Sequence, residues 1–308
     1  YSGDEALKSA AGQWTEALEP VKDYTGNHDL GFMIFCSYGN GYRLTGNEEY
    51  RRVILQAAKS LAARYNPKVG LIQSWNANNR WKYPVIVDNM MNLELLFWAS
   101  KNGGGKELYT IAETHALNTM KYHVREDGST FHVVDFDPET GAVRAKNTHQ
   151  GFADGSCWSR GQAWGVYGFA MSYRETKNPE FLKTARNLAD YFISHLPEDK
   201  VPYWDFQAPG IPNEPRDSSA GAIAASGLLE LSSLAGDDNA AEKYRRAALD
   251  ILSSLCSSKY LGEGTKSPAI LLHATGSRPH NSDVDVSLIY GDYYFLEAIL
   301  RYTYGLKM

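Results

Sequence analysis

The stretch WSRGQAWGVYGFAMSYRE at 158–175, together with EFLKTARNLADYF at 180–192, decides the fold. The first segment carries few charges and many small or aromatic residues, a composition typical of a helix that is buried on all sides. The second has apolar residues at three-to-four spacing with charges between them, as expected for a helix with one face in solvent. Asn178 and Pro179 lie between the segments and indicate where one helix stops and the next starts. We therefore predict an inner helix followed by an outer helix.

The same pattern recurs along the whole chain. Inner segments with few charges stand at 30–44, 89–101, 218–234 and 288–302, and amphipathic outer segments at 5–18, 48–65, 106–122 and 238–255. This continuous repeat, without a Ser/Gly/Pro-rich linker, predicts one all-α domain of ten helices over 1–308. A closed ring of pairs that begins with an outer helix needs an inner partner before residue 1. The pattern therefore also predicts N-terminal helices that are missing from the numbered chain, with an open solenoid as the alternative.

The links from outer to inner helices are long, at 66–87, 124–156 and 197–216. Long links on one face of a repeat array usually carry the function. In the second link, TFHVVDF, the turn DPETG and AVRAK predict a short β-hairpin, because β-branched and aromatic residues alternate around a turn. The rest of the chain is expected to be helical.

Composition argues against several classes of protein. The net charge of −5 is unlike that of a nucleic-acid binder, which presents a basic surface. No run of about 20 apolar residues predicts a membrane-spanning helix. The cysteines Cys36, Cys157 and Cys256 lie far apart and no HExxH spacing occurs, so no CxxC site and no zinc site are expected. We expect a soluble protein, cytoplasmic or periplasmic. The N-terminus shows no secretory pattern, but such a segment can be removed on maturation, so the compartment stays open, as does the oligomeric state.

Carboxylates stand where three inner segments begin. Asp88 follows an apolar run, Asp29 follows His28, and Asp217 begins a later segment. Each fits a helix N-cap, because its oxygens can accept from free backbone N–H groups. Two carboxylates at equivalent ends of neighbouring inner helices would also face one mouth, as in sugar hydrolases that use paired carboxylates. An Asp in an apolar wall favours its protonated form, as a general acid needs. Asn92, one turn beyond Asp88, is expected to face the same side.

Polar and aromatic residues crowd the segment 147–164. Trp158, Arg160, Gln162 and Trp164 open one inner helix, which is unusual for a core element. The Arg guanidinium can donate two parallel charge-assisted hydrogen bonds to a carboxylate, Gln can bond hydroxyl groups and Trp can stack on a sugar face. The cluster therefore indicates a carboxylate or sugar site. A buried polar network is the alternative. His132 lies on the expected hairpin, where a histidine is more often structural than catalytic.

Long ordered motifs across the chain resemble one family. They are HDLGF at 28–32, QSWN at 73–76, VDNMMN at 87–92, FHVVDFDPETG at 131–141, HQGFADGSCWSRGQAWGVYG at 149–168, RDSSAGAIAASGLLEL at 216–231 and GDYYFLEAILR at 291–301. Together they resemble the unsaturated glucuronyl hydrolases, glycoside hydrolase family 88. The resemblance implies an (α/α)6 toroid of six inner–outer helix pairs. It also implies hydration of the C4=C5 double bond of an unsaturated uronic acid at the non-reducing end of an oligosaccharide left by a polysaccharide lyase. No cofactor and no metal are implied.

The resemblance also assigns roles to residues. Asp88 would be the acid/base group that protonates C4 and activates water for C5, and Asp29 would hold Asp88 and the sugar in place. The expected substrate-binding residues are His28, Trp75, His132, Gln150, Trp158, Arg160, Gln162 and Trp164, with Trp164 stacking on the unsaturated ring. Some family members recognise sulfated sugars through a Ser/Lys cluster in the loop at 276–282. Here that loop has no lysine, although Arg278 could serve.

Three alternatives stay open from the residues alone. One is a different sugar-active enzyme on the same toroid, such as an unsaturated rhamnogalacturonyl hydrolase or an inverting glycosidase. Another is a sugar epimerase, and the third is a non-catalytic sugar-binding toroid. The source polysaccharide of the substrate is not fixed by the sequence.

Overall fold

The computed structural model describes residues 2–305, which form two compact units. The first comprises residues up to Val85 together with Met91–Asn118 and Asp135–Arg144, and the second comprises Ile86–Met90, Thr119–Val134 and the chain from Ala145 onward. The single domain expected over 1–308 stays a prediction, and residues 1 and 306–308 of that range lie outside the described part.

Helix α3 is the packing centre for η1, η2 and α2 in the first unit. In chain order the helices up to residue 62 are α1 (Glu5–Glu16), the 3-10 helix η1 (Glu19–Asp23), the π-helix η2 (Gly31–Gly39), α2 (Asn40–Thr45) and α3 (Glu48–Ala62). Helix α3 packs against η1 and η2. Its buried residues include Val53, Ile54, Ala57 and Leu61, the three-to-four spacing expected of an outer helix. Asn47 caps its start by accepting from the Glu49 N–H.

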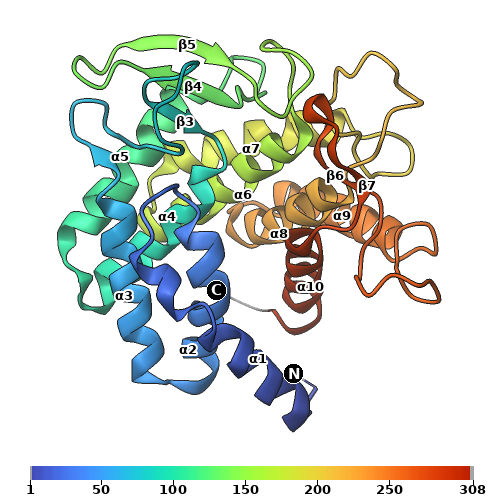
Figure 1. The fold of residues 1–308 in the computed structure, drawn as a ribbon. Coiled ribbons are helices and arrows are strands. Elements are labelled where there is room, and N and C mark those ends of the chain that lie inside the picture. The colour runs from blue at the N-terminus through green and yellow to red at the C-terminus, as the bar shows by residue number, and fades with distance from the viewer. Residues whose placement is uncertain (1, 306–308) are drawn as a thin grey trace. The chain divides into compact units, whose positions relative to one another are not determined.

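The next helices in chain order are α4 (Asn89–Ala99), the π-helix η3 (Ser100–Gly104) and α5 (Lys106–His123). The second unit then contains α6 (Ser159–Thr176), α7 (Pro179–Ser194), α8 (Ser218–Leu234), α9 (Asp238–Leu255) and α10 (Ile289–Tyr304). Helix α8 packs against α6, α9 and α10, and α6 packs against α7 (Figure 1). Every residue of α8 from Ser218 to Leu228 is buried, whereas α9 buries only one face. This contrast confirms the predicted distinction between inner and outer helices.

A small residue brings the inner helices α6 and α8 close together. A Cβ atom at Gly227 would lie 2.9 Å from the Cα of Tyr167. Real Cβ contacts are longer than this, so any side chain at Gly227 would push the two helices apart. The small residues that mark this segment as an inner helix in the sequence are thus required by its packing.

Short strands lie between the helices. An antiparallel hairpin is formed by β1 (Tyr65–Asn66) and β2 (Leu71–Ile72). A three-stranded sheet contains, in this order, β3 (Pro84–Ile86), β4 (Val133–Phe136) and β5 (Val143–Asn147). A second antiparallel hairpin is formed by β6 (Ala274–Ser277) and β7 (Ser282–Val286). Strands β4 and β5 confirm the predicted hairpin. The expectation that the rest is helical is wrong, because β1, β2, β3, β6 and β7 were not predicted.

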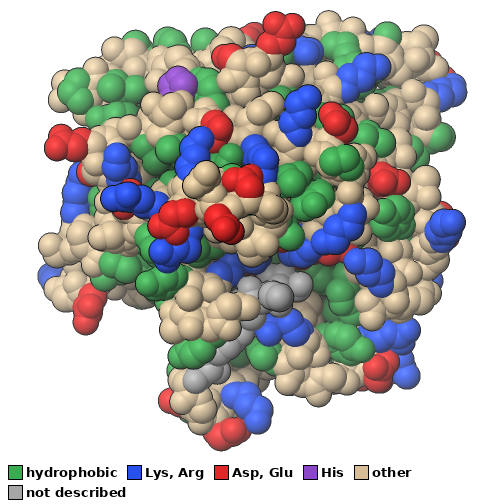
Figure 2. All heavy atoms as spheres, turned by 180° about the vertical axis from the view of Figure 1, so that it is seen from behind, with side chains coloured by type: hydrophobic (Ala, Val, Ile, Leu, Met, Phe, Trp, Pro, Cys, Tyr) green, Lys and Arg blue, Asp and Glu red, His purple; other side chains and the backbone are tan. Residues whose placement is uncertain are grey.

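All ten predicted helical segments are helical in the part of the chain that the structure describes. Within residues 2–305 no helix is both long and apolar enough to span a membrane. On the face seen in Figure 2, acidic and basic side chains are interspersed and form no large region of one sign.

Candidate active site

Asp88 lies in the second unit, directly before the first residue of α4. Its backbone is placed by the chain on either side: the Val87 N–H donates to the His132 carbonyl (3.1 Å) and the Met90 N–H to the Val87 carbonyl (3.1 Å). The side chain is 13% exposed, and Oδ2 lies 4.0 Å from Nε2 of His132. Asp88 is therefore a largely buried carboxyl group that faces an imidazole.

Backbone hydrogen bonds fix the tautomer of His132. Its Nδ1 accepts from the backbone N–H groups of His149 (3.2 Å) and Gln150 (3.3 Å). An N–H group can only donate, so Nδ1 carries no proton and the neutral ring carries its proton on Nε2, the nitrogen that faces Asp88. The ring also lies against Trp158, with centroids 4.4 Å apart. His132 thus presents one N–H to the Asp88 carboxyl group in a fixed orientation.

Arg160 is buried in the first turn of α6 and is held by an ion pair with Asp217, the N-cap of α8. Its guanidinium lies over the Trp158 ring, 4.5 Å from the centroid. Burial opposes its charge, but the carboxylate of Asp217, with Tyr290 and Asp88, outweighs burial and raises the pKa of Arg160. Arg160 therefore stays cationic, and Asp217 is both a cap, as expected, and a counter-ion.

The hairpin of β6 and β7, which sequence analysis missed, is fastened to this cluster. Arg160 donates to the carbonyls of Thr275 (2.6 Å) and Gly276 (2.6 Å), and the Gln150 amide donates to Gly276 as well (3.0 Å). Two of the expected substrate-binding residues thus hold the hairpin in place. The hairpin carries Arg278 at its turn.

Aromatic rings stand beside Arg160. Trp164 is 4% exposed, and its ring meets Tyr294 edge-on at 5.3 Å and Tyr290 at 6.4 Å. Tyr290, in the first turn of α10, also lies 5.3 Å from the Arg160 guanidinium carbon. Sequence analysis did not select Tyr290. The available signal was an aromatic residue in the first turn of an inner helix.

Gln162 does not share this environment. It is fully buried, and its amide donates to the carbonyls of Gly128 (2.7 Å) and Leu188 (3.0 Å) while its oxygen accepts from Thr130 (3.0 Å). Both amide hydrogens are engaged, so nothing remains to bond a sugar hydroxyl. The expectation that Gln162 binds substrate is corrected on this physical ground: its geometry fits the alternative of a buried polar network.

The Gln162→Leu variant tests this correction. We expect the free energy of unfolding to fall by about 2–4 kcal/mol, because two buried carbonyls and a hydroxyl lose their partner. Urea unfolding measures the change, and Gln13→Leu on the exposed surface of α1 is the control, with an expected change within about 0.5 kcal/mol. Unchanged stability together with weakened substrate binding would restore Gln162 to the binding site.

In the first unit the structure brings together His28, Asp29 and Trp75. The His28 N–H donates to the Ser74 carbonyl (3.1 Å), next to Trp75, and Nε2 of His28 lies 3.2 Å from Oδ1 of Asp29. Asp29 is 37% exposed, whereas His28 is 1% exposed. Asp29 is therefore an accessible carboxylate oriented by a buried histidine.

Asn92 has a structural partner in the first unit. It is fully buried, and its oxygen accepts from the Phe32 N–H of η2 (3.1 Å). A Cβ atom at Gly31 would lie 2.6 Å from the Asn92 backbone, so η2 and α4 are in close contact there. Asn92 joins these two helices by a side-chain hydrogen bond.

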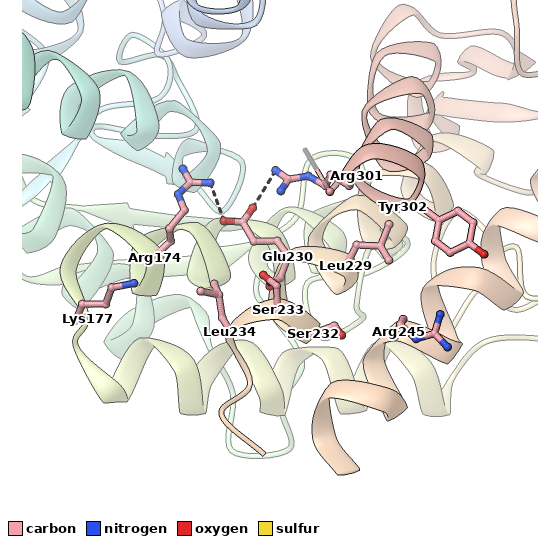
Figure 3. A pocket seen from close by; sticks show the side chains of 11 residues that line it. Arg174, Lys177, Leu229, Glu230, Ser232, Ser233, Leu234, Arg245, Arg301 and Tyr302 are labelled. Carbon is pink, nitrogen blue, oxygen red and sulfur yellow. Dashed lines mark hydrogen bonds and ion pairs between the residues drawn. The ribbon is translucent and has the colours of Figure 1, made fainter. Parts of the chain in front are cut away.

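A cavity of ≈ 550 Å³ lies at the opposite ends of the helices of the second unit, beside the C-terminal turns of α6, α8 and α10. Figure 3 shows Glu230 between Arg174 (2.7 Å) and Arg301 (3.0 Å). Both carboxylate oxygens of Glu230 are paired with arginines, so this cavity offers no uncommitted acid for sugar chemistry. In residues 2–305 no cluster of His, Cys, Asp and Glu is arranged to hold a metal ion.

Comparison with known proteins identifies close relatives. A model of Glycosyl Hydrolase Family 88 matches residues 4–230. An unsaturated glucuronyl hydrolase of Formosa agariphila is 45% identical over 305 residues, covering 97% of this chain and 75% of that protein. A solved unsaturated glucuronyl hydrolase specific for heparin has a TM-score of 0.94 at 45% identity, covering 98% of this chain and 81% of that one. The solved structure of an unsaturated glucuronyl hydrolase variant from Streptococcus agalactiae, complexed with dGlcA-GalNAc6S, has a TM-score of 0.85 at 32% identity. The match covers 100% of this chain and 78% of that one.

Proposed function

The chain belongs to Glycosyl Hydrolase Family 88, and from that premise we propose that it is an unsaturated glucuronyl hydrolase acting on lyase-generated glycosaminoglycan oligosaccharides. Its helical architecture is the (α/α)6 barrel of the solved unsaturated glucuronyl hydrolases that it matches. We propose further that both units belong to one catalytic domain.

The observation that carries this proposal is the setting of Asp88. A carboxyl group that is 13% exposed faces the Nε2–H of His132, close to a buried cation, Arg160, and the Trp158 ring. An acid that must deliver and recover a proton needs such a partly desolvated position with fixed donors around it. A simple helix cap needs neither the imidazole nor the cation.

The reaction adds water across an enol ether. Asp88 donates its proton to C4, the developing oxocarbenium at C5 is stabilised by the resulting carboxylate, and water attacks C5 while returning a proton to Asp88. The product at C5 is a hemiketal, which opens by breaking the C5–O5 bond and leaves a C5 ketone. The hemiacetal formed at C1 then releases the rest of the oligosaccharide. The proton on Asp88 is recovered, so the acid is regenerated in each cycle.

Other residues bind and orient the sugar in this proposal. Trp164 stacks on the unsaturated ring, Trp158 and His132 contact the sugar beside Asp88, and Asp29 orients the substrate with His28 and Trp75. Arg160 and Gln150 act close to the ring and fix the hairpin of β6 and β7. Gln162 has no contact with the sugar and supports the fold instead.

Loss of ultraviolet absorbance tests the proposed function. The C4=C5 bond conjugated to the uronate carboxyl absorbs ultraviolet light, and hydration removes that absorbance. We expect the purified chain to remove the absorbance of unsaturated uronyl disaccharides from chondroitin, hyaluronan and heparin, at rates that differ between the three. Sulfated and unsulfated forms of the chondroitin and heparin disaccharides test whether Arg278 on the hairpin assists recognition of sulfate. An epimerase or a sugar-binding protein would leave every absorbance unchanged, and that result would overturn the proposal.

A further inference from the structure

Tyr290 stands in the proposed active site without an assigned role. It is the second residue of α10, partly buried, with its ring 5.3 Å from the Arg160 guanidinium carbon and 6.4 Å from the Trp164 ring centre. Arg160 lies in the first turn of α6, and Trp164 follows one turn later. Tyr290 thus joins the residues proposed to hold the sugar from a third inner helix.

The hydroxyl group of Tyr290 differs from those of three buried tyrosines in the second unit. Tyr167 donates to Glu297 (2.6 Å), Tyr244 to Asp190 (3.0 Å) and Tyr260 to Asp199 (2.9 Å). Within residues 2–305 the Tyr290 hydroxyl makes no hydrogen bond with the protein. Tyr290 is only partly buried, so this donor remains accessible to a ligand.

The surroundings keep this hydroxyl protonated. Burial raises the pKa of Tyr290 to about 12, with the carboxylates of Asp217, Asp88 and Asp283 adding to the effect and Arg160 opposing it. At neutral pH the group is therefore a hydrogen-bond donor. The contribution of Asp88 means that the phenol lies within the electrostatic reach of the proposed acid.

We propose that Tyr290 is a further substrate-binding residue, whose hydroxyl donates a hydrogen bond to the carboxylate of the unsaturated uronate. This inference rests on the proposed function. Asp88 must approach C4, and the carboxylate is attached to the adjacent C5, so it comes to lie among the groups around Asp88. Tyr290 provides an accessible donor there, and Arg160 beside it provides the positive charge that a carboxylate requires.

The Tyr290→Phe variant removes the hydroxyl and retains the ring. On an unsaturated disaccharide we expect kcat/KM to fall about 10- to 100-fold, because a hydrogen bond to a charged group is lost. On the methyl ester of the same disaccharide, which has no carboxylate charge, the variant should differ from the wild type by less than about threefold. Tyr302→Phe, on the exposed side of α10, is the matched control and should change neither value.

Binding separates this inference from the proposed function. Calorimetry with the unsaturated disaccharide compares Asp88→Asn with Asp88→Asn/Tyr290→Phe, in which turnover plays no part. We expect the second to bind the acid about 10- to 100-fold more weakly and the methyl ester equally well. Equal binding of the acid, or equal losses for acid and ester, would overturn the role of Tyr290. Absence of turnover in the wild type with this binding difference intact would reject the hydration reaction and leave the carboxylate contact standing.

Discussion

The Asp88→Asn variant is expected to lose about 10³-fold or more of kcat/KM while keeping its fold, because general acid–base groups contribute on the order of 10²–10⁴-fold to rate. The amide cannot supply the proton that C4 needs or accept one from water. Asn caps helices as well as Asp does, so the start of α4 should be undisturbed. The substitution therefore separates the catalytic interpretation of Asp88 from the capping interpretation.

The measurements are the loss of ultraviolet absorbance on an unsaturated disaccharide and the melting temperature. Asp237→Asn is the matched control, since Asp237 is an exposed N-cap of α9 that accepts from the Ala240 N–H (2.8 Å). We expect Asp237→Asn to retain full activity and Asp88→Asn to retain sugar binding. Full activity in Asp88→Asn would show that Asp88 is only a cap and that another group protonates C4.

The helices could be predicted because each carries local signals. Helix α7 begins after Asn178, which accepts from the Glu180 N–H, and has Pro179 at its first position. Helix α9 begins after Asp237 in the same way. Such caps and the spacing of apolar residues depend on a few neighbouring residues only. The π-helix η2 could not be predicted, because widening a helical turn by one residue leaves no distinct pattern in GFMIFCSYG.

The hairpin of β6 and β7 was missed for a different reason. Asn281, Asp283 and Asp285 adopt positive φ angles of 48°, 53° and 56°, which Asn and Asp tolerate better than other side chains but which a sequence does not announce. The hairpin is also held from outside by Arg160 and Gln150, more than 100 residues earlier in the chain. A contact between such distant segments has no local signature.

The candidate site shows where adjacency in sequence misleads. Trp158, Arg160, Gln162 and Trp164 were grouped because they alternate along one helix start. On a helix, residues four apart share a face, so Arg160 and Trp164 both reach Tyr290, whereas Gln162 points to Gly128 and Leu188. Residue type identified the site, and helical geometry decides which members of the group can belong to it.

Asp217→Ala is expected to lower the free energy of unfolding by about 3–5 kcal/mol, because removal of one partner leaves the other charge buried and uncompensated. Asp217 is fully buried and forms an ion pair with Arg160. As the cap of α8 it accepts from the Ala220 N–H, and it also accepts from the Ser219 hydroxyl (2.5 Å). In urea unfolding this change should far exceed that of Asp237→Ala, which removes a cap in an exposed position and should cost about 1 kcal/mol.

A double-mutant cycle separates the ion pair from the cap. Arg160→Met removes the buried cation, so in that background Asp217→Ala should cost at least about 2 kcal/mol less than in the wild type. Asp217→Asn retains a capping oxygen and should lie between the wild type and Asp217→Ala in stability. If the two losses simply add, the pair contributes nothing through its charge, and Asp217 would be a cap like Asp237 whose proximity to Arg160 has no energetic consequence.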